Sequence, residues 1–429
     1  MLRIAVPLAL AELGWMSMGV VDTIMVGRLP DSAVSIGAAS VGNALFYVFA
    51  IFGIGLMSGL DTLVSHAFGA NDWPAARRAL ASGFGLAVGA TPILAACILG
   101  GAPLLELIGV TAPVRIAAVS FVHVLVWSLP LLMVYTILRR YIQALHHVRP
   151  VAFALITSNL VNIFGNWLLI FGHWGLPAMG VRGSALSTVF ARIYLASVLV
   201  LAVKWRDPAA FYHAGDVFRG VGKLLRLGLP AALTIGFEVG VFNTATALAG
   251  TLDPVSLAAH TIALNAAAVT YMVPLGISSA AAVSVGRAIG AGDRPGAARA
   301  GWTALGLGVV FEIFSALSFL VFPRQIAELY THDARVVSFA VTLLSIAAVF
   351  QLFDGLQAVA TGALRGLGNT RTPMVWNLLG YWVIGLPLGC WLCFRLRWGA
   401  VGLWDGLCLA LILIGVGLTF VWRNASHGA

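Results

Sequence analysis

Long apolar runs dominate the sequence and restrict its fold more than any other feature. Twelve such runs follow one another, each about 20 residues long and therefore able to cross the hydrocarbon core of a bilayer as a helix. Of the 429 residues, 60% are hydrophobic and only 10% are charged. Soluble domains carry about 25% charged residues. The sequence predicts an all-α polytopic membrane protein with twelve transmembrane helices.

The predicted helices form two sets of six. The first set covers residues 4–27, 38–66, 79–100, 114–138, 151–172 and 183–203, and the second covers 224–250, 257–288, 299–321, 337–362, 373–394 and 399–422. The only long polar connector lies between the two sets and contains Pro208 and Gly220, which are typical linker residues. We therefore predict an N-terminal six-helix lobe (1–204), a cytoplasmic linker (205–223) and a C-terminal six-helix lobe (224–429).

An internal repeat supports the two lobes. The segment FGANDWPAARRA at 68–79 recurs as IGAGDRPGAARA at 289–300, with seven of twelve positions identical, and LRIAVPLAL at 2–10 recurs as LRLGLPAAL at 225–233. Because six helices is an even number, both copies enter the membrane in the same sense. We expect the lobes to be related by a pseudo-twofold axis along the membrane normal, as in many transporters.

Loop charge predicts the orientation. The net charge is +9, and for the predicted helices seventeen Lys and Arg residues fall on one side of the membrane and seven on the other. Basic loops stay in the cytoplasm, so both termini are expected there, with the protein in the cell (inner) membrane. The positive charge therefore predicts orientation rather than nucleic-acid binding. Four cysteines lie in apolar runs. Cys390 and Cys393 form a single CxxC pair, but there is no second pair, and no cofactor is predicted.

Two acids fall at one depth in the predicted C-terminal lobe. Glu238 lies 12 residues after Arg226, roughly 17 Å into the membrane. Asp354 lies 11 residues before Arg365, again roughly 17 Å in. Ionisable groups inside a membrane are costly and mark functional sites, and two neighbouring carboxylates can share a proton or hold a small cation such as sodium. The alternative is a structural pair satisfied by neighbouring hydroxyls.

The N-terminal lobe carries a different set of polar residues. Asp22 lies roughly 28 Å and Asn166 roughly 26 Å into the membrane, counted from Arg3 and Arg149. Asn162 and Asn166 share one helix face because they are four residues apart. A carboxylate facing two amides is a candidate site for a proton or for a hard cation such as sodium, which prefers oxygen ligands. Hydrogen bonding between helices is the alternative.

Further polar residues are candidates for lining a cavity. Gln351 and Gln357 flank Asp354, Asn265 lies in the eighth predicted helix, and Glu12 lies ten residues before Asp22.

Three charged residues inside spans have no such assignment. Arg192 is expected either to pair with a carboxylate or to extend toward the membrane surface. Glu312 and Asp405 remain unassigned.

Several motifs resemble the multidrug and toxic compound extrusion (MATE) family, and its NorM-like bacterial branch in particular. They are VDTIMVGRL at 21–29, FGAND at 68–72, NIFGNWLLIFG at 162–172, the segment at 258–293 and GALRGLGNTRTPM at 362–374. The resemblance covers nearly the whole chain in order. It implies twelve helices in two lobes around a central cleft, with export of amphiphilic, often cationic compounds in exchange for sodium ions or protons.

The resemblance also assigns roles to the buried polar residues. Glu238 and Asp354 match the cation site of the C-terminal lobe, and Asp22, Asn162 and Asn166 match that of the N-terminal lobe. Phe350 stands where the NorM-like site has a tyrosine, so a sodium ion loses one candidate oxygen ligand. Its ring is expected to pack either against an aromatic substrate or in the protein core.

These observations predict a monomeric, cation-coupled antiporter that exports amphiphilic small molecules by alternating access. A flippase for lipid-linked precursors, from the same superfamily, is one alternative, but it needs a basic cleft and Arg192 is the only good candidate for an intramembrane cation. An intramembrane enzyme is another. The sequence contains no GxSxG, HExxH or DDxxD motif that would support it.

Overall fold

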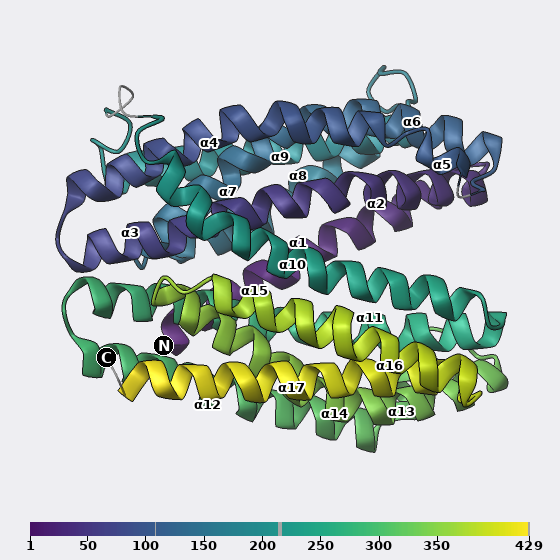
Figure 1. Ribbon diagram of the computed structural model, residues 1–429. Helices are drawn as coiled ribbons and strands as arrows, with labels where there is room; N and C mark the ends of the chain where they lie inside the picture. Colours follow the sequence, from purple (N-terminus) through teal and green to yellow (C-terminus); the bar gives the residue numbers. More distant parts are fainter. Residues whose placement is uncertain (108, 213–216, 428–429) are drawn as a thin grey trace. The chain divides into compact units, whose positions relative to one another are not determined.

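Helices joined by short turns make up the fold (Figure 1). The computed structural model describes residues 1–107, 109–212 and 217–427. In this part of the chain, twelve helical spans are long and apolar enough to cross a membrane. The predicted all-α polytopic fold with twelve spans is therefore confirmed.

Six spans precede the polar connector. Their helices are α1 (Leu2–Val26), α2 (Ser32–Met57), α3 (Gly59–Gly69), α4 (Trp73–Gly100), α5 (Leu104–Leu107), α6 (Ala112–Leu125), α7 (Leu129–Ala144), α8 (Arg149–Phe171) and α9 (Val181–Arg206). The pairs α2–α3, α4–α5 and α6–α7 each form one span. A short 3₁₀ turn, η1 (Val126–Ser128), joins α6 to α7 and ends two residues before Pro130, which cannot donate a backbone hydrogen bond.

Six more spans follow the connector. Their helices are α10 (Val221–Gly250), α11 (Pro254–Gly290), α12 (Arg294–Val321), α13 (Pro323–Glu328), α14 (Ala334–Gly366), α15 (Arg371–Asn377), η3 (Leu378–Gly385), α16 (Leu386–Cys390), η4 (Trp391–Arg395) and α17 (Ala400–His427). Segments η3 and η4 are π-helical turns on either side of Pro387, within the single span formed by α15 to η4. Such wide turns locally change which side chains share a helix face.

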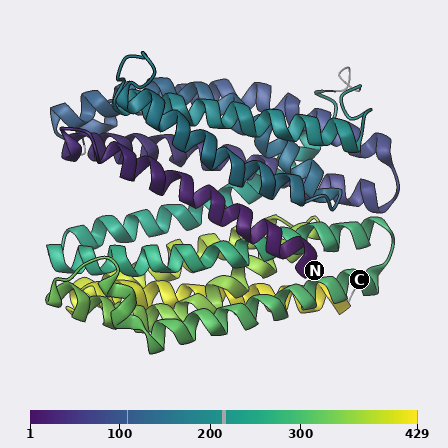
Figure 2. The same cartoon turned by 180° about the vertical axis from the view of Figure 1, so that it is seen from behind.

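The chain divides into two compact units. The N unit contains Leu13–Ala232, and the C unit contains Met1–Glu12 together with Leu233–Ala429. Within the C unit, α12, α14 and α17 lie side by side (Figure 1), and Figure 2 shows the same helices from behind. The predicted domain limits and the pseudo-twofold relation stay predictions. Part of the predicted linker 205–223, residues 213–216, lies outside the described residues.

Helices α1 and α10 each run from one unit into the other. Close contacts at glycine residues hold the N-terminal part of each helix in place. In the N unit, a Cβ on Gly55 would lie 2.5 Å from the Cα of Ala232 in α10. In the C unit, a Cβ on Gly276 would lie 2.8 Å from the Cα of Ala9 in α1. Ala9 and Ala232 occupy matching positions in the repeated LRIAVPLAL and LRLGLPAAL segments. The repeat therefore encodes two equivalent close contacts, which only glycine permits.

The second repeated segment forms the same helix start twice. Asp72 caps α4 by accepting a hydrogen bond from the backbone N–H of Ala75 at 2.9 Å, and Asp293 caps α12 through Gly296 at 2.8 Å. Such caps satisfy backbone donors that have no partner within the helix. The spacing that the two repeated segments share thus reflects one helix-capping motif, which is used in each half of the chain.

A buried ion pair joins the ends of three helices in the N unit. The guanidinium of Arg77 in α4 donates to both carboxylate oxygens of Asp207, at 2.6–3.1 Å, and the Tyr141 hydroxyl in α7 donates to Asp207 at 2.7 Å. Asp207 directly follows α9 and is 2% exposed. Burial alone would raise the pKa of Asp207, but the hydrogen bonds from Arg77 and Tyr141 outweigh it and hold the pKa below its ordinary value.

We expect Asp207→Asn to lower the thermal unfolding midpoint of the detergent-purified protein, at a cost of about 1–3 kcal/mol, because Arg77 loses its charged partner. Since the folded pKa is depressed, the stabilisation is complete above the ordinary value of 3.8 and is lost as the pH falls toward the folded value. The difference between wild type and variant should therefore be largest near neutral pH and shrink in acid. Asp31→Asn is the matched control, because Asp31 is exposed and makes no capping hydrogen bond. An equal loss of stability in both variants would contradict this assignment.

Candidate functional site

The structure brings the predicted N-lobe residues together inside the N unit. The Asn166 amide donates to the Oδ1 atom of Asp22 at 2.6 Å and to the side-chain oxygen of Asn162 at 3.2 Å. Asp22 comes from α1, whereas both asparagines come from the same face of α8. The Asp22 side chain is 7% exposed and both amides are fully buried. Their role in ion coupling stays a prediction.

Helix α9 adds a residue that sequence reasoning missed. The Thr188 hydroxyl donates to the second carboxylate oxygen of Asp22 at 3.3 Å. Close packing of α9 on α8 makes this contact possible, because a Cβ on Gly165 would collide with the Ser187 hydroxyl and one on Gly183 with the Leu169 backbone. Hydroxyl residues are common in membrane helices, so the sequence offered no signal that singled out Thr188.

Arg192 lies one turn beyond Thr188 in α9, and its expected extension toward the membrane surface is wrong. It forms no ion pair with a carboxylate among the described residues, but it interacts electrostatically with Asp22. Its side chain is 2% exposed, so it does not extend to the membrane surface. It donates to the hydroxyls of Ser128 and Tyr47, the latter at 3.1 Å, and its guanidinium lies 4.8 Å from the ring centre of Phe46. Aromatic faces and hydroxyl oxygens stabilise a buried guanidinium without a carboxylate.

The N-unit site retains unused hydrogen-bonding capacity. The Oδ1 atom of Asn166 and the Nδ2 atom of Asn162 are buried and have no hydrogen-bond partner. Among the described residues, Asp22 forms no ion pair with a Lys or Arg side chain, and the cation that acts on it is Arg192, through an electrostatic interaction without direct contact. The site therefore combines an acid with an amide acceptor that is free to take a proton donor or a cation.

In the C unit, Glu238 is held by side chains from two other helices. The Gln357 amide in α14 donates to a carboxylate oxygen of Glu238 at 3.3 Å, and the Tyr271 phenol in α11 also hydrogen-bonds to Glu238. Glu238 itself is half-buried, whereas Gln357 is 1% exposed. Gln357, which was expected to flank Asp354, thus contacts the other predicted acid, Glu238, and Tyr271 was not foreseen.

Two further residues join this network from the irregular span α15–η4. The Gln357 amide also donates to the Asn377 side-chain oxygen at 3.3 Å, and the Tyr381 hydroxyl donates to Gln357 at 3.3 Å. Tyr381 lies in the π-helical segment η3, where the usual helical periodicity fails. A pattern based on 3.6 residues per turn could not predict which way Tyr381 faces.

Asp354 and Glu312 are buried acids with unpartnered oxygens. Asp354 is 5% exposed and Glu312 is fully buried. The Oδ1 atom of Asp354 and both carboxylate oxygens of Glu312 have no hydrogen-bond partner. Asp354 interacts electrostatically with Glu238 and with Glu312. The structure thus places the previously unassigned Glu312 in the same acidic cluster as the two predicted residues.

A glycine brings Glu312 against α14. A Cβ on Gly355 would overlap the Glu312 side chain and lie 2.7 Å from its Oε1 atom. Gly355 directly follows Asp354, so the Glu312 carboxylate packs against the backbone beside that acid. No sequence pattern predicts this contact, because it depends on the packing of α12 on α14.

The remaining predicted residues of α14 serve packing and hydrogen bonding. Gln351 accepts a hydrogen bond from the Thr270 hydroxyl at 2.6 Å and donates to Ser315 at 2.5 Å, so it links α11 to α12. Phe350 is 1% exposed, with its ring centre 5.8 Å from that of Phe242 and 5.3 Å from that of Trp404. Of the two expectations for Phe350, the structure therefore shows packing in the core.

His260 positions the tryptophan that covers Phe350. The Trp404 indole N–H donates to the Nδ1 atom of His260 at 3.1 Å, so Nδ1 must be an acceptor and the ring is neutral with its proton on Nε2. That proton is donated to Thr246 at 2.9 Å, and the Thr246 hydroxyl donates to the Phe242 carbonyl. Each donor in this series of hydrogen bonds has one acceptor. The series therefore holds the cluster of Phe242, Phe350 and Trp404 in place beside the acids.

Three other residues are not assigned to either site. Asn265 is exposed, and its role in lining a cavity stays a prediction. Glu12 is 8% exposed and belongs to the C unit, whereas Asp22 of the same helix belongs to the N unit. Asp405 is half-buried in α17 and stays unassigned.

Neither acidic site has the donor set of a resident metal centre. In the described part of the chain, no group of three or more His, Cys, Asp or Glu residues is arranged to hold a metal ion. A sodium ion at either site would therefore need amide, hydroxyl or backbone oxygens in addition to the acids. The predicted sodium binding stays a prediction.

The fold and these sites define an all-helical, multi-pass membrane protein whose two units each hold a buried acidic site. The chain belongs to the MatE family, whose family model matches residues 7–168 and 230–391. The resemblance found in the sequence is thereby confirmed.

Curated relatives match over almost the full chain. The chain is 36% identical to a probable multidrug resistance protein NorM of Mesorhizobium japonicum, over 98% of this chain and 92% of the relative. It is 39% identical to the multidrug resistance protein NorM of Burkholderia vietnamiensis, again over 98% and 92%.

Solved structures show the same fold. The eukaryotic MATE transporter AtDTX14 matches with a TM-score of 0.90 and 23% identity, over 100% of this chain and 96% of that chain. An outward-facing multidrug resistance MATE family transporter of the MOP superfamily matches with a TM-score of 0.86 and 16% identity, over 100% and 95%.

The contact between Gly355 and Glu312 predicts that Gly355→Ala destabilises the wild-type protein but stabilises a variant that lacks the Glu312 carboxylate. Gly355→Ala should destabilise the wild-type protein by about 1–3 kcal/mol, because the added methyl group overlaps the Glu312 side chain. In a Glu312→Ala background the overlap disappears, and the same change should stabilise by up to about 1 kcal/mol through helix propensity. Thermal unfolding of the four proteins of this double-mutant cycle measures the coupling.

Gly306→Ala in α12 is the control, because nothing lies within 4 Å of its added Cβ. It should be neutral or slightly stabilising in both backgrounds. If Gly355→Ala changes stability equally with and without Glu312, the two residues are not in contact.

Proposed function

We propose that this protein is a cation-coupled antiporter that exports amphiphilic, often cationic compounds, including drugs, by alternating access. The names of its relatives, multidrug resistance proteins, support the substrate class. The buried acids of the two units support the coupling. In this proposal the protein is a monomer in the cell (inner) membrane with both termini in the cytoplasm, and it needs no organic cofactor.

One observation carries the proposal of cation coupling: the unpartnered carboxylate oxygens of Asp354 and Glu312. An ionised carboxylate buried without a partner is strongly unfavourable, because it loses its hydration and gains nothing in return. Among the described residues, neither acid forms an ion pair with a basic side chain. Each must therefore bind a proton or another cation to be stable in this conformation.

Such binding can drive transport because it depends on conformation. A ligand shifts an equilibrium between two states only by the difference in its affinity for them. Loading the acids of the C unit stabilises the buried arrangement seen here, whereas an arrangement that exposes them to water favours the ionised form. Cation binding and substrate binding would then be coupled reciprocally, as antiport requires.

The N unit provides the second coupling site in this proposal. Both oxygens of Asp22 accept hydrogen bonds, from Asn166 and Thr188. Those donors stabilise the carboxylate, so this site needs a cation less than the acidic cluster of the C unit does. A sodium ion would have to replace donors with oxygen ligands, whereas a proton can bind at a carboxylate oxygen directly.

Neutral amides at the two main acids should stop coupled export. We expect Asp354→Asn and Asp22→Asn each to reduce dye efflux from cells or vesicles by about tenfold or more, since an amide cannot be loaded and unloaded with a proton. Insertion into the membrane should be unchanged and is checked by the amount of folded protein recovered.

Surface acids of the same units serve as controls. Glu328 is exposed and pairs only with its helical neighbour Arg324, so Glu328→Gln is the control for the C unit, and Asp31→Asn is the control for the N unit. Both should transport normally. If the Asp354 and Asp22 variants also transport normally, these acids do not couple transport.

The coupling ion can be assigned with single gradients. Because Phe350 offers no hydroxyl and packs among aromatic rings, and because Asp22 faces hydrogen-bond donors, we expect a proton gradient alone to drive dye efflux from vesicles. A sodium gradient alone should leave efflux within about twofold of the rate without a gradient. Efflux driven by sodium alone would identify sodium as the coupling ion and contradict the expectation for protons.

A further inference from the structure

Arg192 places a permanent positive charge in the interior of the N unit. Its side chain is 2% exposed, and in the part of the chain that the structure describes it forms no ion pair with a carboxylate. A guanidinium group is not deprotonated in proteins, so burial cannot remove its charge. A buried charge is costly, and inside a membrane span it marks a functional residue.

Side chains from α2 and η1 hold the Arg192 guanidinium in one position. It donates to the Ser128 hydroxyl in η1 and to the Tyr47 hydroxyl in α2, the latter at 3.1 Å. Its Cζ atom lies 4.8 Å from the centre of the Phe46 ring, which packs edge-on against the Tyr47 ring with 5.4 Å between the ring centres. Ser128 and Phe46 are fully buried. These contacts hold the guanidinium where it does not touch Asp22.

Helix α9 brings this charge to within one turn of the Asp22 site. The Ser187 hydroxyl donates to the Asn162 carbonyl at 2.8 Å, and the Thr188 hydroxyl donates to Asp22 at 3.3 Å. Arg192 follows Thr188 by four residues, so the two side chains occupy adjacent turns of one helix face. Asp22 and Arg192 accordingly interact electrostatically. Among the described residues, the other side chains that act on Asp22 are neutral, namely Asn162, Asn166 and Thr188.

The charge of Arg192 opposes the loading of Asp22 with a cation. While Asp22 is ionised, the two opposite charges offset each other inside the N unit. A proton or a sodium ion at Asp22 cancels the carboxylate charge and leaves the Arg192 charge buried without compensation, which is unfavourable. A direct ion pair would hold Asp22 firmly in its ionised form, whereas the separation leaves a weaker, longer-range effect. Burial of Asp22 favours loading and Arg192 opposes it, so the site can both load and unload.

We propose that Arg192 is a positioning residue that lowers the cation affinity of Asp22 and thereby lets the N-unit site release its cation during transport. It acts through Asp22 and does not itself touch the cation. The release step rests on the proposed function. The electrostatic effect on Asp22 is present whether or not the protein transports anything, so it can be measured separately.

A purely structural role for Arg192 predicts a different result. Because Arg192 also links α9 to α2 and η1, its replacement should lower stability in either case. A lysine keeps the charge but cannot reproduce the planar contacts of a guanidinium. Comparison of Arg192→Gln, which removes the charge, with Arg192→Lys, which keeps it, therefore separates the effect of charge from the effect of packing.

The first experiment titrates Asp22 in the full-length protein purified in detergent. Infrared absorption of protonated carboxyl groups is recorded against pH, and the part that is lost when Asp22→Asn is added to the same protein belongs to Asp22. Arg192→Gln should move the pH midpoint of this part upward by about one unit, which is about a tenfold increase in proton affinity. Arg192→Lys should keep it within about 0.3 units of the wild type. If Arg192→Gln does not purify as a single species, Arg192→Met carries the test with the same expected shift, because it also removes the charge.

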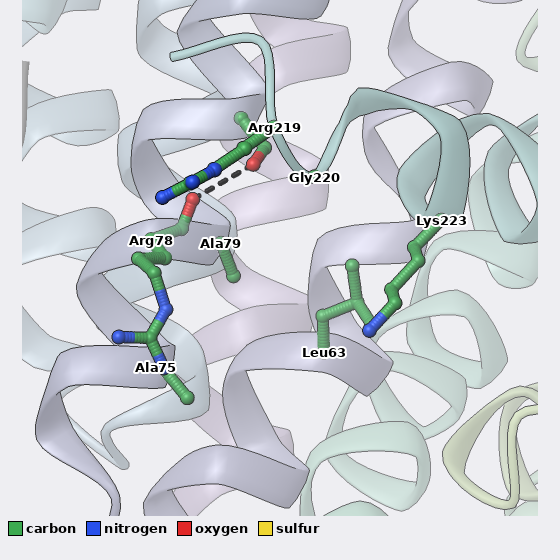
Figure 3. A pocket seen from close by; sticks show the side chains of 8 residues that line it. Leu63, Ala75, Arg78, Ala79, Arg219, Gly220 and Lys223 are labelled. Atoms are coloured by element: carbon green, nitrogen blue, oxygen red, sulfur yellow. Dashed lines mark hydrogen bonds between the residues drawn. The ribbon is translucent and has the colours of Figure 1, made fainter. Parts of the chain in front are cut away.

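Two control variants test whether the shift is specific to the buried charge. Arg78→Gln removes an exposed positive charge of the same unit, from a pocket of about 330 Å³ that is lined by none of the residues around Asp22 (Figure 3). Tyr47→Phe removes a hydrogen bond to the Arg192 guanidinium but leaves its charge. Both variants should keep the Asp22 midpoint within about 0.3 pH units of the wild type.

The second experiment measures dye efflux driven by a proton gradient as a function of pH. If Asp22 couples transport, the efflux profile of Arg192→Gln should move to higher pH together with the infrared midpoint. A shifted infrared midpoint with an unshifted efflux profile supports the effect of Arg192 on Asp22 but contradicts the proposed coupling at Asp22. An unchanged infrared midpoint in Arg192→Gln, or an equal shift in Arg192→Lys or Arg78→Gln, would overturn the inference about Arg192.

Discussion

Close backbone contacts at Gly55 and Gly276 determine how the two acid-bearing helices run. They fix the start of α10 in the N unit and the start of α1 in the C unit. Further along the same helices, Glu238 lies in the C unit and Asp22 in the N unit. Each helix that carries a candidate coupling acid therefore begins in the other unit. A change in charge at Asp22 or Glu238 therefore acts on a helix whose N-terminal part is held by a close contact that only glycine allows.

The spans could be predicted from the sequence because lipid imposes one requirement on every helix: enough apolar length. The predicted first and last residues of the helices were less accurate. Helix α11, predicted at 257–288, runs from Pro254 to Gly290 because Asp253 caps it and its ends continue past the apolar core. The repeat predicted equivalent loops, and Asp72 and Asp293 show the physical reason, a helix cap at matching positions.

The candidate sites were predictable where regular periodicity holds. Asn162 and Asn166 share a face of α8, and counting residues from the basic loops places them at about the depth of Asp22. Periodicity fails at Tyr381, because a π-helical turn changes the direction of its side chain. It also says nothing of Glu312, whose place depends on packing against Gly355. Such contacts between helices have no signature within either helix.

The family model matches both halves of the chain, but the two units differ in how many of their carboxylate oxygens accept hydrogen bonds. In the N unit, both oxygens of Asp22 accept hydrogen bonds from amide and hydroxyl donors. In the C unit, Asp354 and Glu312 retain buried oxygens without partners, beside a third acid. The cost of leaving a charge unpaired is therefore concentrated in the C unit. Because only a site that is unstable when empty gains much from loading, the proposed cation uptake would bias conformation mainly through the C unit, with Asp22 making a smaller contribution.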